Sequence, residues 1–424
     1  MNRDSQNQDR RERDTKMDRE NTPDPHEETT ERGRGPGWVM LGLLPLLGLG
    51  VLLALIVVNG SGIGREDVPP VEELTVNRVT MPGEGEFVVN VTNSGPDPVT
   101  VEQVTVNEAL WNFEIADGES TIQPRESTSI TIPYPWDEGG AYTMGLITNT
   151  GVVAAEPEVP VAVLTPEFSG ETFARYALIG FYVGVVPVSL GLLWYPFLRR
   201  VGAAGINFVL ALTVGLLVYL AVDTLLEATE FAAELPSFLS GIPLVLLVTM
   251  LTLIGLLWTE RMFRRGREEA SRLSTSYRIA GGIGLHNLGE GLAIGAAFAL
   301  GEAALGTFLV IGFTLHNITE GVGIAAPVLK VRRPSLWHFA ALALIGGGPA
   351  ILGTWIAGFA YSNLLSVVFL SIGTGAILQV IYEVGKLTLK DSTRAKTPAF
   401  SATNLGGLTV GIAIMYTTGL LVMV

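Results

Sequence analysis

The chain has 424 residues, of which 48% are hydrophobic and 16% charged, and it contains no cysteine. The absence of cysteine excludes a disulfide framework and thiolate metal sites. A formal net charge of −14 gives no reason to expect a nucleic-acid partner. The large apolar fraction places the chain among membrane proteins.

The N-terminal segment consists of a polar tail followed by an apolar run. Residues 1–37 contain ten acidic and eight basic side chains and almost no apolar ones, so we expect a disordered cytoplasmic tail. Residues 38–59 form an apolar run that begins too late and extends too far for a cleaved signal peptide. We therefore predict a retained N-terminal transmembrane anchor.

Residues 68–165 have a different character, with short alternating segments separated by turn clusters such as Asn93-Ser94-Gly95-Pro96. Seven short strands at this spacing predict an extracytoplasmic β-sandwich that is immunoglobulin-like in architecture. The segment 60–170 carries 18 acidic and three basic side chains, which fits an exposed module that meets high salt or raises the local cation concentration. The sequence points to no particular ligand for this domain. The expected strands are 73–79, 86–92, 99–106, 111–115, 127–132, 142–149 and 159–163.

Residues 172–424 contain eight further apolar spans, each long enough to cross a lipid bilayer as a helix. Six arginines occupy 259–278, whereas the loops at 227–239, 301–303 and 361–362 contain no Lys or Arg. This alternation predicts a multi-pass protein of the cell membrane with a cytoplasmic N-terminus and an extracytoplasmic C-terminus. The predicted fold class is an all-α polytopic membrane domain with an extra N-terminal helix and a β-sandwich. The eight spans are 172–197, 203–226, 240–258, 277–300, 304–328, 336–360, 363–385 and 402–423.

The most informative motif is the hexapeptide H-N-x-x-E-G, which occurs at 286–291 and again at 316–321. Each copy lies inside an apolar span, where an ionisable group costs about 2.5–3.5 kcal/mol and usually marks an ion or substrate path. At about 100° per residue, the first, second and fifth positions share one face of a helix. Each helix therefore presents an imidazole, an amide oxygen and a carboxylate together.

The two copies lie near the middle of consecutive spans that run in opposite directions, as in transporters with a site at the membrane midplane. Imidazole nitrogen combined with carboxylate and amide oxygen suits divalent transition metals such as Zn²⁺, Fe²⁺, Mn²⁺ or Co²⁺. The alternative is that each His–Glu pair is a polar clamp that only holds helices together. We predict a shared site for a transported ion, which is cargo and not a cofactor. The expected ligands are His286, Asn287, Glu290, His316, Asn317 and Glu320.

These paired motifs resemble those of the ZIP divalent-metal transporters and are most similar to the bacterial zinc-uptake and GufA-like branch. The resemblance covers about 172–424, including flanking residues such as Gly291-Leu292-Ala293 and Ala325-Ala326-Pro327. It implies that the hexapeptides are the metal-site motifs of the family's fourth and fifth helices, with the six side chains above as ligands. It also implies an elevator-like movement and a homodimer. The β-sandwich and the extra first span are additions to the family pattern.

Two departures from the family pattern affect this expectation. The branch usually has proline at the fourth motif position, where this chain has Gly289 and Thr319, so a helix bend would arise in another way or be smaller. The family's sixth helix commonly has a glutamate just before a proline, where this chain has Gly348 ahead of Pro349. One expected ligand is therefore missing, and the sequence leaves a one-metal and a two-metal site both open.

An acidic mouth is expected on the outer side. Asp223 lies near the outer end of its span, and Glu227 and Glu230 fall in the following loop, which has no basic residue. Such a cluster would attract cations toward the membrane. The alternative is a helix end that is simply exposed to water.

An exit is expected on the inner side. Gln379 and Glu383 are an i,i+4 pair near the inner end of their helix and would receive the ion before release. The alternative for Glu383 is an ordinary interfacial pair with Lys386. The sequence Gly346-Gly347-Gly348-Pro349 is expected to interrupt its own helix.

Together these features predict an uptake transporter that moves a divalent transition metal into the cytoplasm, and they do not predict an enzyme. Zinc is the first candidate for the metal, with iron or manganese as alternatives. One rival is an intramembrane metalloenzyme in which the ion activates water, although the signature H-E-x-x-H is absent. Another rival is a metal sensor that signals through the β-domain.

Overall fold

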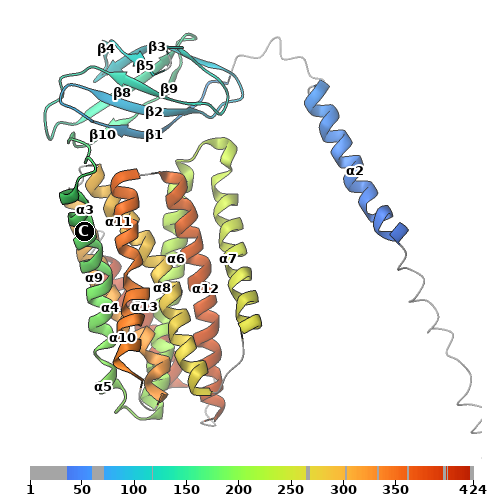
Figure 1. Cartoon of the computed structure of the whole chain (residues 1–424), viewed down its shortest axis with the longest axis vertical. Coiled ribbons are helices and arrows are strands. Elements are labelled where there is room, and N and C mark those ends of the chain that lie inside the picture. Colours follow the sequence, from blue (N-terminus) through green and yellow to red (C-terminus); the bar gives the residue numbers. More distant parts are fainter. Residues whose placement is uncertain are drawn as a thin grey trace, which may run out of the picture. The chain divides into compact units, whose positions relative to one another are not determined.

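The computed structural model describes residues 36–59, 71–116, 118–263, 268–300, 303–331, 334–360, 362–394, 398 and 400–420. The chain separates into two units, Met1–Pro69 and Pro70–Val424. The described part of the first unit is α2 (Pro36–Asn59), an apolar helix with Pro45 inside it. Nearly all of the predicted tail lies outside the described residues. The second unit contains a β-sheet region followed by a helical region (Figure 1).

The β-sheet region consists of two antiparallel sheets that share one hydrophobic core. One sheet has the order β1-β2-β7-β5, and the other β10-β8-β3-β4, with β6 paired to β3 and β9 to β8. Phe87, Val89 and Val91 of β2 are fully buried, so alternate side chains of this strand face the core. The strands are β1 (Leu74–Thr80), β2 (Phe87–Asn93), β3 (Val99–Val106), β4 (Ala109–Trp111), β5 (Glu114–Ile115), β6 (Thr121–Ile122), β7 (Ser127–Ile132), β8 (Tyr142–Thr148), β9 (Val153–Ala155) and β10 (Glu158–Val159).

The structure differs from the expected strands where they are short. The segment 111–115 is not one strand, because Trp111 ends β4, which pairs with β3, and Glu114 begins β5, which pairs with β7. Strands β6 and β9 are too short to show the alternation on which the prediction depends. Of the expected strand 159–163, only Val159 belongs to a strand.

The helical region forms a bundle whose long helices lie side by side (Figure 1). Six segments are long and apolar enough to cross a membrane by length and composition: Gly170–Leu198, Ala203–Ala233, Ser237–Thr259, Leu305–Lys330, Leu336–Ala360 and Asn363–Arg394. These segments indicate a multi-pass membrane protein. The helices are α3 (Gly170–Gly180), η1 (Phe181–Val185), α4 (Val186–Leu192), α5 (Tyr195–Leu198), α6 (Ala203–Ala233), η2 (Ser237–Leu239), α7 (Gly241–Phe263), α8 (Glu268–Ala299), α9 (Ala303–Ala325), η3 (Ala326–Lys330), α10 (Leu336–Gly347), α11 (Pro349–Ala360), α12 (Asn363–Arg394) and α13 (Ala402–Leu420).

Three of the nine expected spans, in α2, α8 and α13, are not among these six segments, and of α2 only Leu44–Leu55 counts as a shorter apolar helix. Helix α8 carries the first hexapeptide together with Arg272 and Arg278, and these polar residues lower its hydropathy. The described part of α13 ends before the apolar residues at 421–424. The nine-span topology therefore stays a prediction.

Several helix boundaries follow from local sequence. Ser169 and Ser335 are N-caps whose hydroxyls accept a backbone N–H in the first turns of α3 and α10. The expected interruption is present, since α10 ends at Gly347 and α11 begins at Pro349. Proline has no N–H to donate to the preceding turn, so the helix cannot continue regularly through this point.

Helix α6 is longer than predicted. We expected a loop at 227–239, but α6 continues to Ala233, so Glu227 and Glu230 are helical. Ala228 and Ala232 are buried in a cluster with Val245 of α7 and residues of α12, and this packing extends the helix beyond the apolar run. Asp223 is therefore well inside α6 and not near its end.

Glycines allow very close packing within one set of helices, which we call the motif group: α3 to α5 and α8 to α11. A methyl group added at Gly291 of α8 would lie 2.2 Å from the carbonyl oxygen of Ala350 in α11. One added at Gly184 of η1 would lie 2.1 Å from the carbonyl oxygen of Gly347 in α10. Backbone thus packs directly on backbone, as small residues permit in membrane helices.

A second set, which we call the support group, consists of α6, α7, α12 and α13. A methyl group added at Gly411 of α13 would lie 2.2 Å from the carbonyl oxygen of Leu212 in α6. One added at Gly375 of α12 would lie 2.6 Å from the carbonyl oxygen of Thr249 in α7. This group is therefore also held together by close backbone contacts.

Packing between the two groups is looser. At Gly289 the atom nearest to an added methyl group is the side-chain Cδ2 of Leu370, and at Gly373 it is His286 Cα at an ordinary 3.4 Å. At Gly282 and Gly323, on the same boundary, side-chain atoms of Val380 and Thr213 are met first. Close backbone contacts thus hold each group together, whereas side chains make most of the contacts between the groups, among them the ion pair of Arg272 with Asp391.

This packing predicts opposite outcomes for two alanine substitutions in α8. Gly291→Ala should lower the thermal unfolding temperature in detergent, because its Cβ has no room beside Ala350. Gly281→Ala is the matched control, since nothing lies within 4 Å of a Cβ there. It should leave stability unchanged or raise it by up to about 1 kcal/mol, because alanine favours helix over glycine. Equal unfolding temperatures for the two variants would contradict the close packing of α8 against α11.

Candidate metal centre

Helices α8 and α9 bring the two hexapeptides into contact. Glu290 and His316 are equally far along the chain from Ala303, where α9 begins, so an antiparallel pair places them opposite each other. His286 Nε2 lies 3.1 Å from Glu290 Oε1, and His316 Nε2 contacts the same oxygen. Ligand atoms of His286, Glu290 and His316 all lie within 4.8 Å of one another, and the three residues are buried. This is a compact group of metal-ligand type.

Glu320 is not a member of that group, although its hexapeptide position matches that of Glu290. Its side chain is 3% exposed. The amide of Asn287 lies near this carboxylate, but neither carboxylate oxygen forms a hydrogen bond of normal length and angle with the described residues. Glu290, in contrast, contacts both imidazoles and also accepts a hydrogen bond from Asn317 Nδ2 at 2.9 Å.

The motif asparagines turn their oxygens away from the surrounding backbone. Asn287 Nδ2 donates to the carbonyl oxygen of Gly346, and Asn317 Nδ2 donates to that of Val183, each at 2.9 Å. A carbonyl can only accept, so the amide nitrogen must face it and the amide oxygen must face the other way. Both Oδ1 atoms are buried without a hydrogen-bond partner among the described residues. These oxygens are therefore the atoms that the asparagines can offer to a cation.

Both carbonyls that hold the asparagines belong to irregular helix segments. Val183 lies in η1, a π-helical segment in which the N–H of Val186 bonds back to the carbonyl of Phe181. Gly346 lies just before the break at Pro349. Such irregularities release main-chain carbonyls from their usual i+4 donors. The sequence predicts the second irregularity from Pro349. The signal for the first is Pro187, which lies four residues after Val183 and has no N–H to donate to its carbonyl.

The expected glutamate position before Pro349 has no room for a side chain. A Cβ at Gly348 would lie 2.4 Å from the carbonyl oxygen of Leu344. The missing ligand therefore belongs to a tight junction between α10 and α11 that requires glycine. The structure groups His286, Glu290 and His316 as potential metal ligands, without a carboxylate from this junction.

One residue beside the centre was not expected from the sequence. Thr224 of α6 is fully buried, and its Oγ1 lies 2.9 Å from His286 Nδ1. A threonine in an apolar helix is common, and only the three-dimensional packing of α6 against α8 distinguishes this one. Its neighbour Asp223 is exposed, and Glu227 is partly buried one turn further on. The acidic residues thus lie along α6 beside and beyond Thr224, inside a helix and not in a loop.

The expected exit residues are both buried on α12. Gln379 and Glu383 are 3% and 6% exposed. The sequence left a pair between Glu383 and Lys386 open, whereas the structure gives Glu383 Oε2 a hydrogen bond from Arg278 of α8 at 2.9 Å. The ammonium group of Lys386 instead lies over the ring of Tyr382, 5.1 Å from its centroid. The ion pair with Arg278 was hidden from the sequence because the partners are far apart in the chain.

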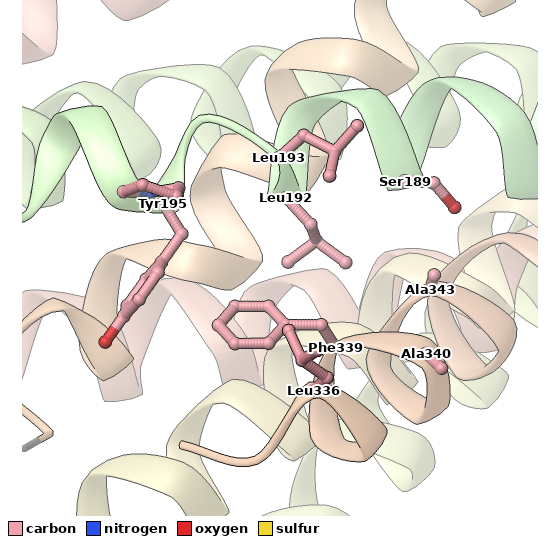
Figure 2. A pocket seen from close by; sticks show the side chains of 9 residues that line it. Ser189, Leu192, Leu193, Tyr195, Leu336, Phe339, Ala340 and Ala343 are labelled. Carbon is pink, nitrogen blue, oxygen red and sulfur yellow. The ribbon is translucent and has the colours of Figure 1, made fainter. Parts of the chain in front are cut away.

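A separate hollow of about 280 Å³ lies between α4, α5 and the start of α10 (Figure 2). Figure 2 shows Phe339 and Leu336 facing Leu192 across it. The rings of Tyr195 and Phe339 lie 4.8 Å apart by centroid. Its lining contains no carboxylate and no imidazole, so it does not suit a metal ion.

Fold and centre together define a multi-pass membrane protein with a buried histidine and carboxylate group that can hold a metal ion. Comparison with known proteins agrees with this class. The chain is 34% identical over 119 residues to a provisionally named zinc transporter from Arabidopsis thaliana. The match covers 27% of this chain and 18% of the relative, so the chain matches less than a fifth of that relative's length. No protein-family model matches the chain.

Proposed function

We propose that this protein transports divalent transition-metal ions into the cytoplasm, zinc first, with iron or manganese as alternatives. The observation that carries the proposal is a set of four buried oxygens that form no hydrogen bond of normal length and angle with the described residues, in the same two hexapeptides as the paired imidazoles. They are the Oδ1 atoms of Asn287 and Asn317 and both carboxylate oxygens of Glu320. The distant zinc-transporter relative supports the same class of function.

A cation explains this arrangement better than a structural clamp does. A buried acceptor that lacks a donor costs roughly 1–3 kcal/mol, and a charged one costs more. A clamp would satisfy its own acceptors, as the surrounding carbonyls of Val183 and Gly346 are satisfied. A divalent ion would coordinate the free oxygens and the imidazole nitrogens together, and mixed nitrogen and oxygen ligands suit zinc and its neighbours. We assign His286, Asn287, Glu290, His316, Asn317 and Glu320 as ligands.

The division of the bundle supports a route for movement. In our proposal the motif group carries the ion past the support group along this boundary, and ion pairs such as that of Arg272 with Asp391 break and re-form on the way. This is the elevator-like movement that the resemblance to ZIP transporters implies. The ion arrives past Asp223 and leaves past Gln379 and Glu383. Glu383 must exchange its ion pair with Arg278 for the metal on the way out.

The remaining assignments complete the proposal. The protein lies in the cell membrane with a cytoplasmic N-terminus, an anchor at 38–59 and an extracytoplasmic C-terminus. The two-sheet region is an extracytoplasmic, immunoglobulin-like domain whose acidic residues gather cations near the membrane. As the resemblance implies, the transporter is a homodimer.

Metal flux into proteoliposomes tests the function. The full chain is reconstituted, and uptake of radioactive Zn²⁺ is measured against protein-free vesicles. We expect saturable uptake of Zn²⁺. Unlabelled Fe²⁺ or Mn²⁺ should reduce this uptake if it shares the site. Mg²⁺ and Ca²⁺ should leave it unchanged, since they prefer purely oxygen ligands. Binding without flux would defeat the proposal and favour a metal sensor or an intramembrane metalloenzyme.

A further inference from the structure

Thr224 lies where it can control the orientation of His286. Its hydroxyl oxygen is 2.9 Å from His286 Nδ1, and the two side chains are 0% and 4% exposed. The other ring nitrogen, Nε2, faces Glu290 Oε1 at 3.1 Å. The ring is thus held at both ends, by α6 at one nitrogen and by the metal centre at the other.

The chemistry of the neutral imidazole assigns each nitrogen a different task. A neutral ring has one N–H, and the nitrogen that binds a metal must present its lone pair. Because Nε2 points into the centre, the hydrogen belongs on Nδ1, where Thr224 Oγ1 can accept it. Such a partner fixes both the tautomer and the direction of a metal-binding histidine.

We infer that Thr224 is a positioning residue of the metal centre, which holds His286 in the orientation that binds the ion. The inference rests on the proposed function, since it concerns how the same ligands take up a metal. Thr224 touches the ligand and not the ion, so it acts through His286.

The position of Thr224 gives this hydrogen bond a second consequence. Thr224 belongs to the support group, whereas His286 belongs to the motif group. A shift of one group past the other separates the two side chains. In the proposed movement, the bond therefore strengthens metal binding only while the groups keep the register of this structure, and it is lost in the register from which the ion leaves. A contact made in one state and not in the other gives the two states different affinities.

Three threonine substitutions test the inference. Thr224→Val keeps the shape and removes the hydroxyl, whereas Thr224→Ser keeps the hydroxyl. Thr213→Val is the matched control, because Thr213 is also buried on α6 but donates its hydroxyl hydrogen to the carbonyl oxygen of Val209 in its own helix at 2.9 Å. Binding of Zn²⁺ to the full chain in detergent is measured by competition with a fluorescent chelator, and uptake kinetics are measured in proteoliposomes.

We expect Thr224→Val to weaken Zn²⁺ binding by about 10- to 100-fold, the usual effect of removing an outer partner of a metal ligand. Its KM for uptake should rise by a similar factor while the maximal rate changes much less, since the bond is absent when the ion leaves. Thr224→Ser and Thr213→Val should bind Zn²⁺ like the unchanged protein. If Thr224→Val does not fold, Thr224→Ala takes its place with the same expectation.

Unchanged binding by Thr224→Val, or an equal loss in Thr213→Val or Thr224→Ser, would overturn the role of the hydroxyl. A fall in maximal rate at constant KM would also overturn it. These results differ from failure of the proposed function, in which the unchanged protein itself would neither bind nor transport Zn²⁺.

Discussion

Glu290→Ala and His316→Ala should each reduce Zn²⁺ uptake into proteoliposomes to the level of protein-free vesicles. Glu290 is the one carboxylate that both imidazoles contact, and His316 is one of these two rings. Removing either side chain takes a carboxylate or an imidazole nitrogen from the three residues whose ligand atoms lie within 4.8 Å of one another. The remaining ligands cannot replace the hydration shell of a dehydrated ion at this depth.

Both variants should still fold, because the freed histidine or glutamate can be neutral in the buried centre. Thermal unfolding in detergent checks this point. Glu171→Gln is the matched control, since Glu171 is 74% exposed in its pair with Arg175 and lies at the start of α3. Its uptake should equal that of the unchanged protein. Full uptake by both Glu290→Ala and His316→Ala would defeat the assignment of the metal centre.

Asp391→Asn should destabilise the protein by about 3–5 kcal/mol, measured as a loss of unfolding free energy in detergent. Asp391 Oδ1 accepts a hydrogen bond from Arg272 at 2.7 Å, and Oδ2 accepts one from Lys330, also at 2.7 Å. The side chains of Arg272 and Asp391 are 6% and 1% exposed. The substitution leaves the guanidinium of Arg272 buried without a counter-charge, and this is the main cost.

A double variant separates the charge from the packing. Arg272→Met combined with Asp391→Leu removes both buried charges, and Lys330 can turn to solvent because its side chain is already 29% exposed. We expect the pair of substitutions to recover most of the lost stability, as apolar replacement of buried ion pairs often does. Breaking the exposed pair with Glu171→Gln should change the stability little. A double variant as unstable as Asp391→Asn would show that packing, and not the uncompensated charge, is responsible.

Sequence periodicity was sufficient to predict the contacts within a helix. His286 and Glu290 are one helical turn apart, and the structure places them within hydrogen-bond distance on one face of α8. The meeting of Glu290 with His316 followed from two oppositely directed neighbours with motifs at the same depth. The interruption of the helix at Gly348 followed from a proline preceded by three glycines.

Contacts that depend on distant segments could not be predicted. The partner of Asn317 is the carbonyl of Val183 in η1, which Pro187 four residues later leaves without a helical donor, but the sequence does not show that Asn317 reaches it. Thr224 reaches His286 from another helix, and Arg278 reaches Glu383 across the boundary between the groups. In each case the sequence contains many residues of the same chemical type that could have been the partner. Tertiary packing alone selects the partner.

The uneven distribution of hydrogen bonds between the two hexapeptides has a consequence for how the ion is captured. Glu290 already holds two imidazoles and an amide, whereas Glu320 holds none of the described residues by a hydrogen bond. In the proposed transporter, an arriving ion binds Glu320 first, because it must displace existing partners before it binds Glu290. The two motif glutamates therefore act at successive stages of ion capture in this proposal. Exchanging the two hexapeptides should consequently change ion binding.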